Sequence, residues 1–210
     1  SSSACWSTAC ARTVGWSSSE AVGRRGARDG GAVGLTVEIL GLGPALEYRR
    51  HQLLSEPWRL LTGHFVHLSL LHAMLNGVAL LLLGRLFADR LRVVELWAIL
   101  TGAPLAISLV FWAALPELGW YRGLSGALHA LYFAGCVVWL RGSRGRGRWL
   151  PMAALVGGLL KVLLEQPWDA SFPFHAWLGA PVVPQAHLVG AIVGTAAGLY
   201  LAARRTIPAP

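Results

Sequence analysis

A serine flanked by glycines is the residue of this sequence best suited to nucleophilic chemistry. Ser125 stands within Gly123-Leu124-Ser125-Gly126 and runs directly into the apolar segment 127–140. In soluble hydrolases a Gly-x-Ser-x-Gly turn follows a strand and presents its serine to backbone N–H groups that bind an oxyanion. Because this serine opens an apolar helix instead, the sequence excludes the soluble-hydrolase elbow. Two interpretations of Ser125 remain: it is a packing detail, or it is a nucleophile at a membrane surface.

His187 is the histidine that a spacing of small residues relates to this serine. Residues of this kind recur every four positions on both segments: Gly126, Ala130 and Ala134 on one, Gly190, Gly194 and Gly198 on the other. Such stripes let membrane helices approach closely. Close approach would bring the serine hydroxyl within reach of the imidazole, as an activated nucleophile requires. Taken alone, however, the stripes favour a simpler interpretation, in which they only pack helices and His187 is an interfacial histidine.

A second polar pair, His72 and Asn76, lies four residues apart and therefore on one helix face. Both side chains are costly in hydrocarbon, and both can donate hydrogen bonds. Together with the backbone N–H of Ser125 they could stabilise a developing oxyanion, an effect of roughly 3 kcal/mol per donor. The alternative is a structural pair whose members satisfy each other across helices.

The composition indicates the elements that must position these residues. The chain of 210 residues is 55% hydrophobic and only 13% charged, which is typical of a polytopic membrane protein and not of a soluble domain. The net charge of +8 comes from arginine tracts between apolar runs, a pattern of membrane orientation signals and not of nucleic-acid binding. Three scattered cysteines, Cys5, Cys10 and Cys136, have neither disulfide nor metal-site spacing. We expect no cofactor and no metal.

Hydropathy predicts an all-α polytopic bundle of six helices. Five segments are clear, at 68–86, 93–115, 124–140, 150–164 and 182–203. The first, 32–46, falls short of the ~20 residues needed to cross a bilayer and is weak or truncated. The membrane domain is expected at 31–205, between a disordered or non-native tail at 1–30 and a short tail at 206–210.

Arginine placement predicts the orientation. The tracts follow the second, fourth and sixth segments and also lie in the amino-terminal tail; they are Arg90 and Arg92, Arg141 to Arg148, Arg204 and Arg205, and Arg24 to Arg28. The positive-inside rule therefore places both termini in the cytoplasm if all six segments span. His72, Ser125 and His187 then lie at one level, just below the outer surface.

At this point the residues resemble a known family, the rhomboid intramembrane serine proteases. The resemblance covers about residues 47–203 and rests on Trp58-Arg59, His67, Ser69, His72, Asn76, Gly123 to Gly126, Ala186-His187, Gly190 and Gly194. Within that superfamily the chain looks most like the rhombosortases, which are thought to process bacterial proteins bearing a C-terminal Gly-Gly-containing membrane anchor. That finer likeness rests on the stretch 58–64, the Leu-Ser-Gly-x-Leu-His sequence ending at His129, and the stretch 161–166.

The resemblance implies a role for each matching residue. Ser125 would be the nucleophile and His187 the general base, while His72 and Asn76 would stabilise the oxyanion. Three glycines would support the site, with Gly190 allowing the helices to approach; they are Gly123, Gly126 and Gly190. His129 departs from the tyrosine that many rhomboids place against the catalytic histidine, which leaves open whether it only orients His187 or also shares a proton.

Several other polar residues near the expected outer surface have no assigned role. Spacing gives no reason to aim Glu165 or Asp169 at His187, so a Ser-His dyad is expected. Lys161 and Glu165, four residues apart, could pair, snorkel or recognise substrate. Loop hydrogen bonding is expected for His64 and His67. A further histidine, His175, would belong to an aromatic anchor or to a mobile cap.

The predicted function is an intramembrane serine endopeptidase of the bacterial inner membrane. It would cleave membrane-anchored proteins that carry a transmembrane C-terminal anchor, through an acyl-enzyme and with its site toward the periplasm. The lipid bilayer is its other partner. Two alternatives stay open: a non-catalytic rhomboid-like binding protein, and a metal-handling membrane protein. The latter would use as ligands His64, His67, His72, His129 and His187.

Overall fold

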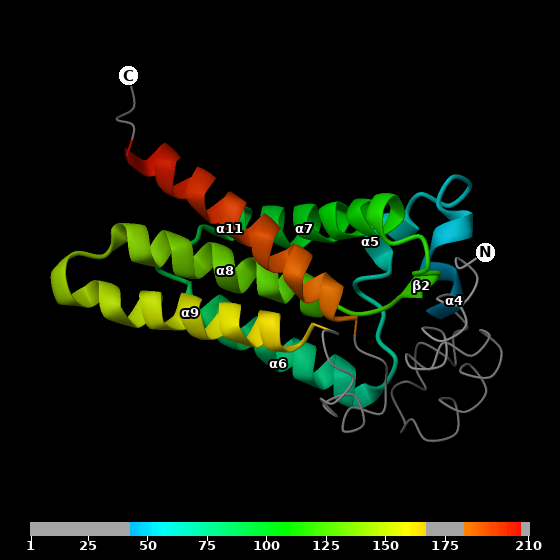
Figure 1. Ribbon diagram of the computed structural model, residues 1–210, viewed down its shortest axis with the longest axis horizontal. Helices are drawn as coiled ribbons and strands as arrows, with labels where there is room; N and C mark the ends of the chain where they lie inside the picture. Colours follow the sequence, from blue (N-terminus) through cyan, green and yellow to red (C-terminus); the bar gives the residue numbers. More distant parts are fainter. Residues whose placement is uncertain (1–42, 167–182, 207–210) are drawn as a thin grey trace, which may run out of the picture.

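The computed structural model describes residues 43–166 and 183–206. Within them the chain forms five long helices (Figure 1): α6 (Leu70–Leu86), α7 (Val93–Ala114), α8 (Ser125–Gly142), α9 (Trp149–Leu164) and α11 (Pro184–Thr206). The five predicted segments are thus confirmed as helices, with ends shifted by a few residues. Most of the weak first segment lies outside the described residues; its last four form the short helix α4 (Gly43–Leu46). Helix α11 runs one residue into the tail predicted at 206–210.

Three of these helices are long and apolar enough to cross a membrane, namely Val93–Ala114, Gly145–Leu164 and Pro184–Arg205. The stretch Leu71–Leu86 is a shorter apolar helix. Only two residues of α9 are buried, Pro151 and Val162, so most of its apolar surface faces outward. An apolar outer surface of this kind suits lipid, and the chain is an all-α polytopic membrane protein.

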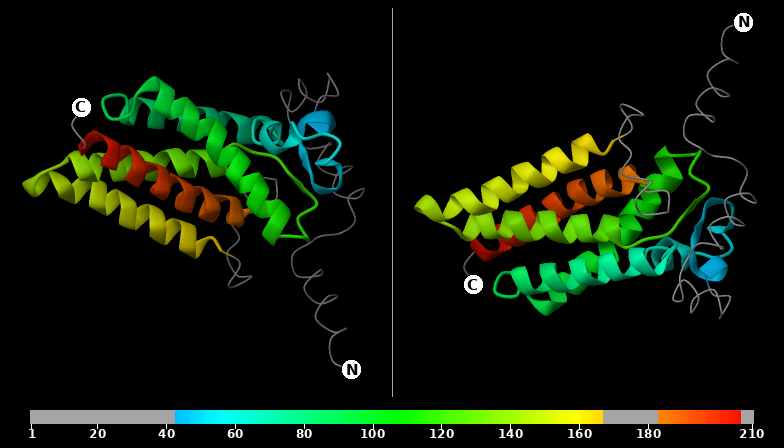
Figure 2. Two further views of the ribbon diagram at one scale, coloured as in Figure 1. Left: turned by 90° about the horizontal axis from the view of Figure 1, so that it is seen from above. Right: turned by 90° about the horizontal axis from the view of Figure 1, so that it is seen from below.

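Helix α8 is the centre of the bundle. It contacts α6, α7, α9 and α11, and both views of Figure 2 place it between α9 and α6. Its small and aliphatic residues, among them Ala127, Leu131 and Ala134, are fully buried. Fully buried positions at three- and four-residue intervals follow from the 3.6-residue helical period, so α8 is covered by its neighbours along its length.

Short elements close the end of the bundle at which α8 begins. Strands β1 (Tyr48–Arg49) and β2 (Trp120–Tyr121) pair antiparallel, next to α5 (Arg59–Thr62). The buried guanidinium of Arg59 donates to the carbonyls of Pro44 (2.7 Å) and Glu47 (2.8 Å) and pairs with the Glu56 carboxylate. The side-chain carboxylate of Glu47 in turn pairs with Arg122 at 2.6 Å. These bonds fix the loop that leads into α8.

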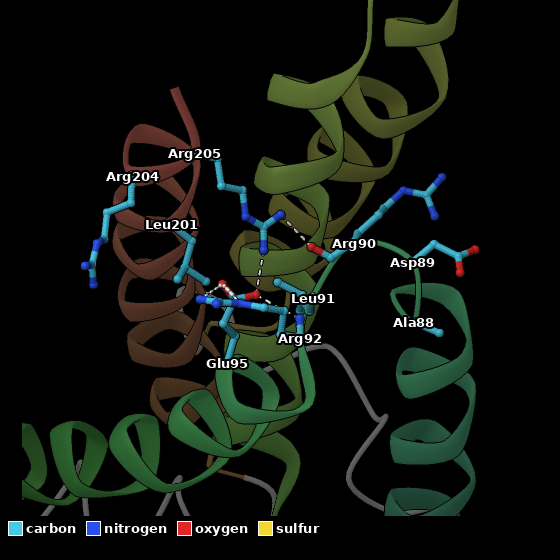
Figure 3. Close-up of a pocket in the computed structure, with 9 residues that line it drawn as sticks. All are labelled: Ala88, Asp89, Arg90, Leu91, Arg92, Glu95, Leu201, Arg204 and Arg205. Carbon is cyan, nitrogen blue, oxygen red and sulfur yellow. Dashed lines mark hydrogen bonds and ion pairs between the residues drawn. The ribbon is translucent and has the colours of Figure 1, made fainter. Parts of the chain in front are cut away.

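The opposite end is closed by ion pairs around a pocket of about 590 Å³. Figure 3 shows Arg205, near the end of α11, pointing at Glu95 in the first turn of α7. Arg205 bonds the Glu95 carboxylate at 2.5 Å and the Arg90 carbonyl at 2.6 Å, while Arg92 pairs with the same carboxylate at 3.0 Å. Arg205 therefore ties α11 to the start of α7 through Glu95 and to the preceding turn through the Arg90 carbonyl.

Candidate active site

Ser125 is the first residue of α8, held there by a fixed turn. Gly123 has φ 133°, a conformation that glycine adopts readily and other residues rarely. A Cβ at this position would also lie 2.9 Å from Cε1 of His72. The Gly123 N–H donates to the Gly63 carbonyl (3.1 Å), and its own carbonyl accepts from the Tyr121 hydroxyl (2.7 Å). The serine is thereby held at a helix N-terminus beside the His72 ring.

Helices α8 and α11 touch backbone to backbone along their small residues. A Cβ added to Gly190 would overlap the carbonyl oxygen of Gly126, and one added to Gly194 would lie 2.6 Å from Cα of Ala130. Neither helix could hold larger residues here without moving apart. The two stripes of small residues therefore face each other, and the first turns of α8 and α11 are in direct contact.

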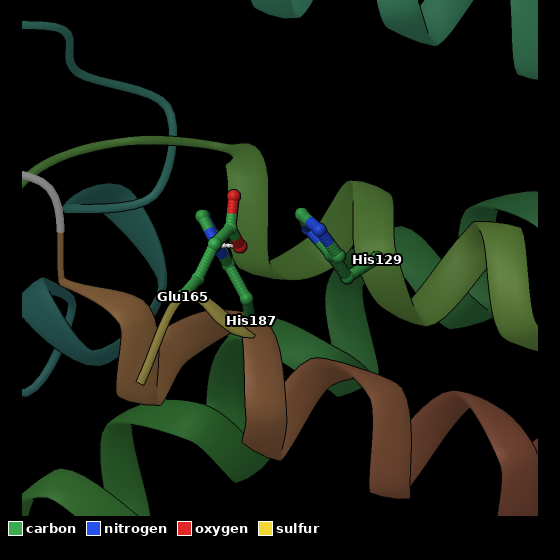
Figure 4. A group of neighbouring side chains, drawn as sticks. All are labelled: His129, Glu165 and His187. Carbon is green, nitrogen blue, oxygen red and sulfur yellow. Dashed lines mark hydrogen bonds and ion pairs between the residues drawn. The ribbon is translucent and has the colours of Figure 1, made fainter. Parts of the chain in front are cut away.

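At this contact the Ser125 hydroxyl and the His187 imidazole are hydrogen-bonded, with 3.0 Å between Oγ and Nε2. The other ring nitrogen, Nδ1, lies 2.9 Å from Oε2 of Glu165 (Figure 4). An ionised carboxylate can only accept, so Nδ1 carries the proton and Nε2 is free to accept from the serine. This is the tautomer that a general base needs.

The expectation that no carboxylate would face His187 is wrong for Glu165. Spacing along α9 could not reveal the contact because it fixes only the face of α9 on which Glu165 lies, and what that face meets depends on how α9 packs against α11. Asp169, the other carboxylate considered, lies outside the described residues. One signal did point to Glu165, since a charged pair with Lys161 at a membrane helix end is costly and calls for a function.

Lys161 and His129 complete the surroundings of this carboxylate. The Lys161 ammonium donates to both Glu165 oxygens, at 2.7 and 2.8 Å, and to Nε2 of His129 at 3.0 Å. The His129 ring stacks on His187, with centroids 4.1 Å apart and 16° between planes. Its Nδ1 donates to the backbone carbonyl of Ser125 at 2.7 Å. Both nitrogens of His129 are therefore engaged elsewhere, so it touches His187 face to face and shares no hydrogen bond with it.

His72 and Asn76 lie four residues apart on α6. The His72 ring lies against Gly123, and Asn76 is 6% exposed. Nδ1 of His72 and Nδ2 of Asn76 are both buried and without a hydrogen-bond partner in the described part of the chain. Buried unpaired polar groups are rare and costly, so the predicted mutual pairing of these two side chains does not account for them.

The two histidines before α6 lie apart from the serine–histidine pair. His64 is fully buried and its Nε2 lies 2.9 Å from the Ser108 hydroxyl, as loop hydrogen bonding predicts. Burial away from water lowers its pKa to about 3, so it stays neutral. The His67 ring packs edge-on against His72 at 5.1 Å, and burial lowers its pKa to about 4. His175 lies outside the described residues.

Three of these side chains have the composition of a metal site. Ligand atoms of His129, Glu165 and His187 lie within 4.8 Å of one another. However, the Lys161 ammonium already donates to two of the three, and each His187 nitrogen already has a hydrogen-bond partner. A cation among them would meet a fixed positive charge, so the donor set does not fit a metal.

Comparison with known proteins places this geometry in a family. The Rhomboid domain matches residues 54–204. The rhomboid protease GlpG of Salmonella paratyphi A is 31% identical over 143 residues, which are 67% of this chain and 47% of that protein. The Salmonella choleraesuis GlpG is 32% identical over the same shares. The chain spans about half the length of these curated relatives. Because the domain match covers most of the helical bundle, including the serine, histidine and asparagine described above, the chain belongs to the rhomboid family.

Proposed function

We propose that the chain is an intramembrane serine endopeptidase in which Ser125 is the nucleophile and His187 the general base. The observation that carries this proposal is the 3.0 Å hydrogen bond between Oγ and Nε2, at the contact of α8 and α11 within a rhomboid domain. As Oγ attacks a peptide carbonyl, its proton passes to Nε2 and then to the leaving amine. Water hydrolyses the resulting acyl-enzyme by the same path in reverse.

The oxyanion of the tetrahedral intermediate would be held by His72, Asn76 and the backbone N–H of Ser125. Buried nitrogens without partners support this role, since an oxyanion would accept from Nδ2 of Asn76 and from Nδ1 of His72 in its Nδ1–H tautomer. The Ser125 N–H lies in the first turn of α8, where backbone N–H groups have no helical acceptor. Donors held in place before the reaction contribute roughly 3 kcal/mol each.

The proposed substrates are proteins of the bacterial inner membrane with a C-terminal Gly-Gly-containing anchor, cleaved at the periplasmic face. The likeness of residues 58–64, 124–129 and 161–166 to rhombosortases supports this class. Glycine destabilises a helix by about 1 kcal/mol relative to alanine, so such an anchor unwinds readily at its outer end. The arginines of the α8–α9 loop support a cytoplasmic position for that loop and hence a periplasmic one for Ser125.

The test uses the full chain in proteoliposomes with a Gly-Gly anchored substrate and a matched substrate carrying Leu-Leu. We expect Ser125→Ala and His187→Ala to abolish cleavage and the Leu-Leu substrate to be cleaved far more slowly. The control Ser143→Ala removes a hydroxyl from the other end of α8, where it bonds the Trp139 carbonyl, and should cleave as the wild type does.

Three outcomes separate the alternatives. Cleavage that survives Ser125→Ala would rule out the nucleophile. Cleavage lost with a chelator and restored by metal would support the metal-handling protein. Binding without cleavage, across a panel of anchors, would support the non-catalytic protein.

A further inference from the structure

The carboxylate of Glu165 occupies a position that a merely structural ion pair does not require. Its side chain is 24% exposed, and Oε2 faces Nδ1 of His187 at 2.9 Å. A surface Lys-Glu pair at i, i+4 contributes little by itself, and here the lysine precedes the glutamate, the less favourable order. An ion pair with Lys161 alone therefore does not explain why Glu165 contacts His187.

Lys161 connects this carboxylate to the second histidine of the site. Its ammonium bonds both oxygens of Glu165 and Nε2 of His129, and His129 bonds the Ser125 carbonyl. The bonds form a closed ring that runs from the serine backbone through three charged or ionisable side chains to His187 and back to the serine hydroxyl. Each member fixes the orientation of the next.

We propose that Glu165 is a positioning residue that holds His187 in its Nδ1–H tautomer and stabilises the imidazolium formed when Ser125 loses its proton, and that Lys161 holds this carboxylate in place. This inference rests on the proposed function and departs from a Ser-His dyad. In a Ser-His-Asp triad the buried carboxylate has the same two tasks and does not itself take the proton. The ring of His129 stacks on that of His187 and limits its rotation.

The charges balance at each stage of the step. Before attack, the ammonium and the carboxylate cancel and both histidines are neutral. During attack the serine O–H bond breaks, its proton forms an N–H bond at Nε2 of His187, and the new O–C bond leaves one negative charge on the carbonyl oxygen. The imidazolium is then flanked by Glu165, and the oxyanion by the His72 and Asn76 donors.

The environment of Glu165 keeps it ionised for this task. Burial raises the pKa of this carboxyl, but the hydrogen bonds from His187 and Lys161 and the charge of Lys161 outweigh burial and hold the pKa below its ordinary value. Among the described residues, the titratable groups that face His187 are Glu165 and Lys161 from α9, His129 from α8 and His72 from α6. Of these, the carboxylate favours the imidazolium and the ammonium opposes it.

This opposition gives the two residues opposite signatures in a pH profile. The readout is the rate at which a fluorophosphonate probe labels Ser125 in the full chain in detergent, from pH 5 to 9, which requires no identified substrate. For Glu165→Gln we expect the rate to fall by about 10²- to 10⁴-fold and the acidic limb of the profile to move to lower pH, because imidazolium loses its counter-charge. For Lys161→Gln we expect a smaller fall, about tenfold, with the limb moving to higher pH.

Two further variants separate positioning from folding. Glu165→Asp should recover part of the rate lost in Glu165→Gln, since it restores a carboxylate. Glu117→Gln removes an exposed carboxylate from the loop between α7 and α8 and should label as the wild type does. A general loss of folding lowers the rate but does not move the acidic limb of Glu165→Gln to lower pH and that of Lys161→Gln to higher pH. The shift predicted for Lys161→Gln can be measured even if Glu165→Gln is unstable.

The outcomes distinguish this inference from the proposed function. Absence of labelling in the wild type, or equal labelling of Ser125→Ala, would overturn the proposed function itself. If the wild type is labelled and both variants keep its rate and profile, or shift in the same direction, the positioning role is refuted while the serine protease stands.

Discussion

The contact between α8 and α11 is so close that one methyl group should disable the site. Gly190 lies three residues after His187 on α11, and Gly126 follows Ser125 on α8. In Gly190→Ala the new Cβ would overlap the Gly126 carbonyl oxygen and lie 3.0 Å from its carbon. Carbon atoms pack at about 3.5–4.0 Å, so the helices must separate by roughly 1 Å at this point.

That displacement is large relative to the geometry it disturbs. The bond from Oγ of Ser125 to Nε2 of His187 is 3.0 Å, and a further ~1 Å exceeds the range of a hydrogen bond. Misplacement of a reacting group by about 1 Å can cost 10²-fold in rate. We therefore expect Gly190→Ala to label with fluorophosphonate about 100-fold more slowly than the wild type, and to unfold at a lower temperature in detergent.

Two glycines of the same chain provide controls. Gly157 in α9 faces open space, so Gly157→Ala should keep the wild-type rate. At Gly198 a Cβ would meet the carbonyl oxygen of Ala134 at 2.8 Å, but this position is about 16 Å along α11 from His187. Gly198→Ala should therefore lower stability with a much smaller loss of rate. A Gly190→Ala protein that labels at half the wild-type rate or faster would refute the reasoning.

Two further predictions concern stability. His64 has a folded-state pKa of about 3, lowered by burial, against ~6.5 when unfolded, so the unfolded chain binds more protons between these values. Stability from this group is complete above about pH 6.5 and falls as pH is lowered, by up to about 1.4 kcal/mol per pH unit. Thermal unfolding at pH 7.5 and 5 should show a drop that His64→Gln reduces; an equal drop in both proteins would contradict this. Arg59→Met should cost about 2–4 kcal/mol, because it leaves the carbonyls of Pro44 and Glu47 without their donor, while the partly exposed Glu56 carboxylate can be hydrated. Thermal unfolding measures this, and Arg59→Lys should retain part of the stability; a melting temperature unchanged in Arg59→Met would show that these bonds contribute nothing net.

The helices and the face-to-face stripes are visible in the sequence because both are short-range periodicities. A run of apolar residues of membrane length predicts a helix wherever it packs, and small residues every fourth position predict a close contact on one face. Matching Ser125 with His187 needed one more argument, that arginine tracts set the level of each residue in the membrane. Each of these signals is a property of one segment or of its ends.

The contacts that escaped prediction depend on how separate elements turn toward each other. Glu165 continues the helical spacing of α9 by one residue, but that spacing does not say which neighbouring helix its side chain meets. The pairing of Glu47 with Arg122 joins residues 75 positions apart and likewise has no local signature. His129 could be placed one turn from Ser125, yet its stacking on His187 follows from the crossing of α8 and α11.

The cost of charges near hydrocarbon gives a physical reason why the carboxylate of the site comes with a lysine. A lone ionised glutamate at this depth would favour protonation and would then lose its value as a counter-charge to imidazolium. The Lys161 ammonium offsets that tendency, although its charge also opposes imidazolium. It bonds both oxygens of Glu165 and Nε2 of His129, whereas at Nδ1 of His187 the bonded group is the carboxylate. In the proposed mechanism, this charged pair is retained despite its insertion cost because Glu165 orients His187 and Lys161 keeps Glu165 ionised.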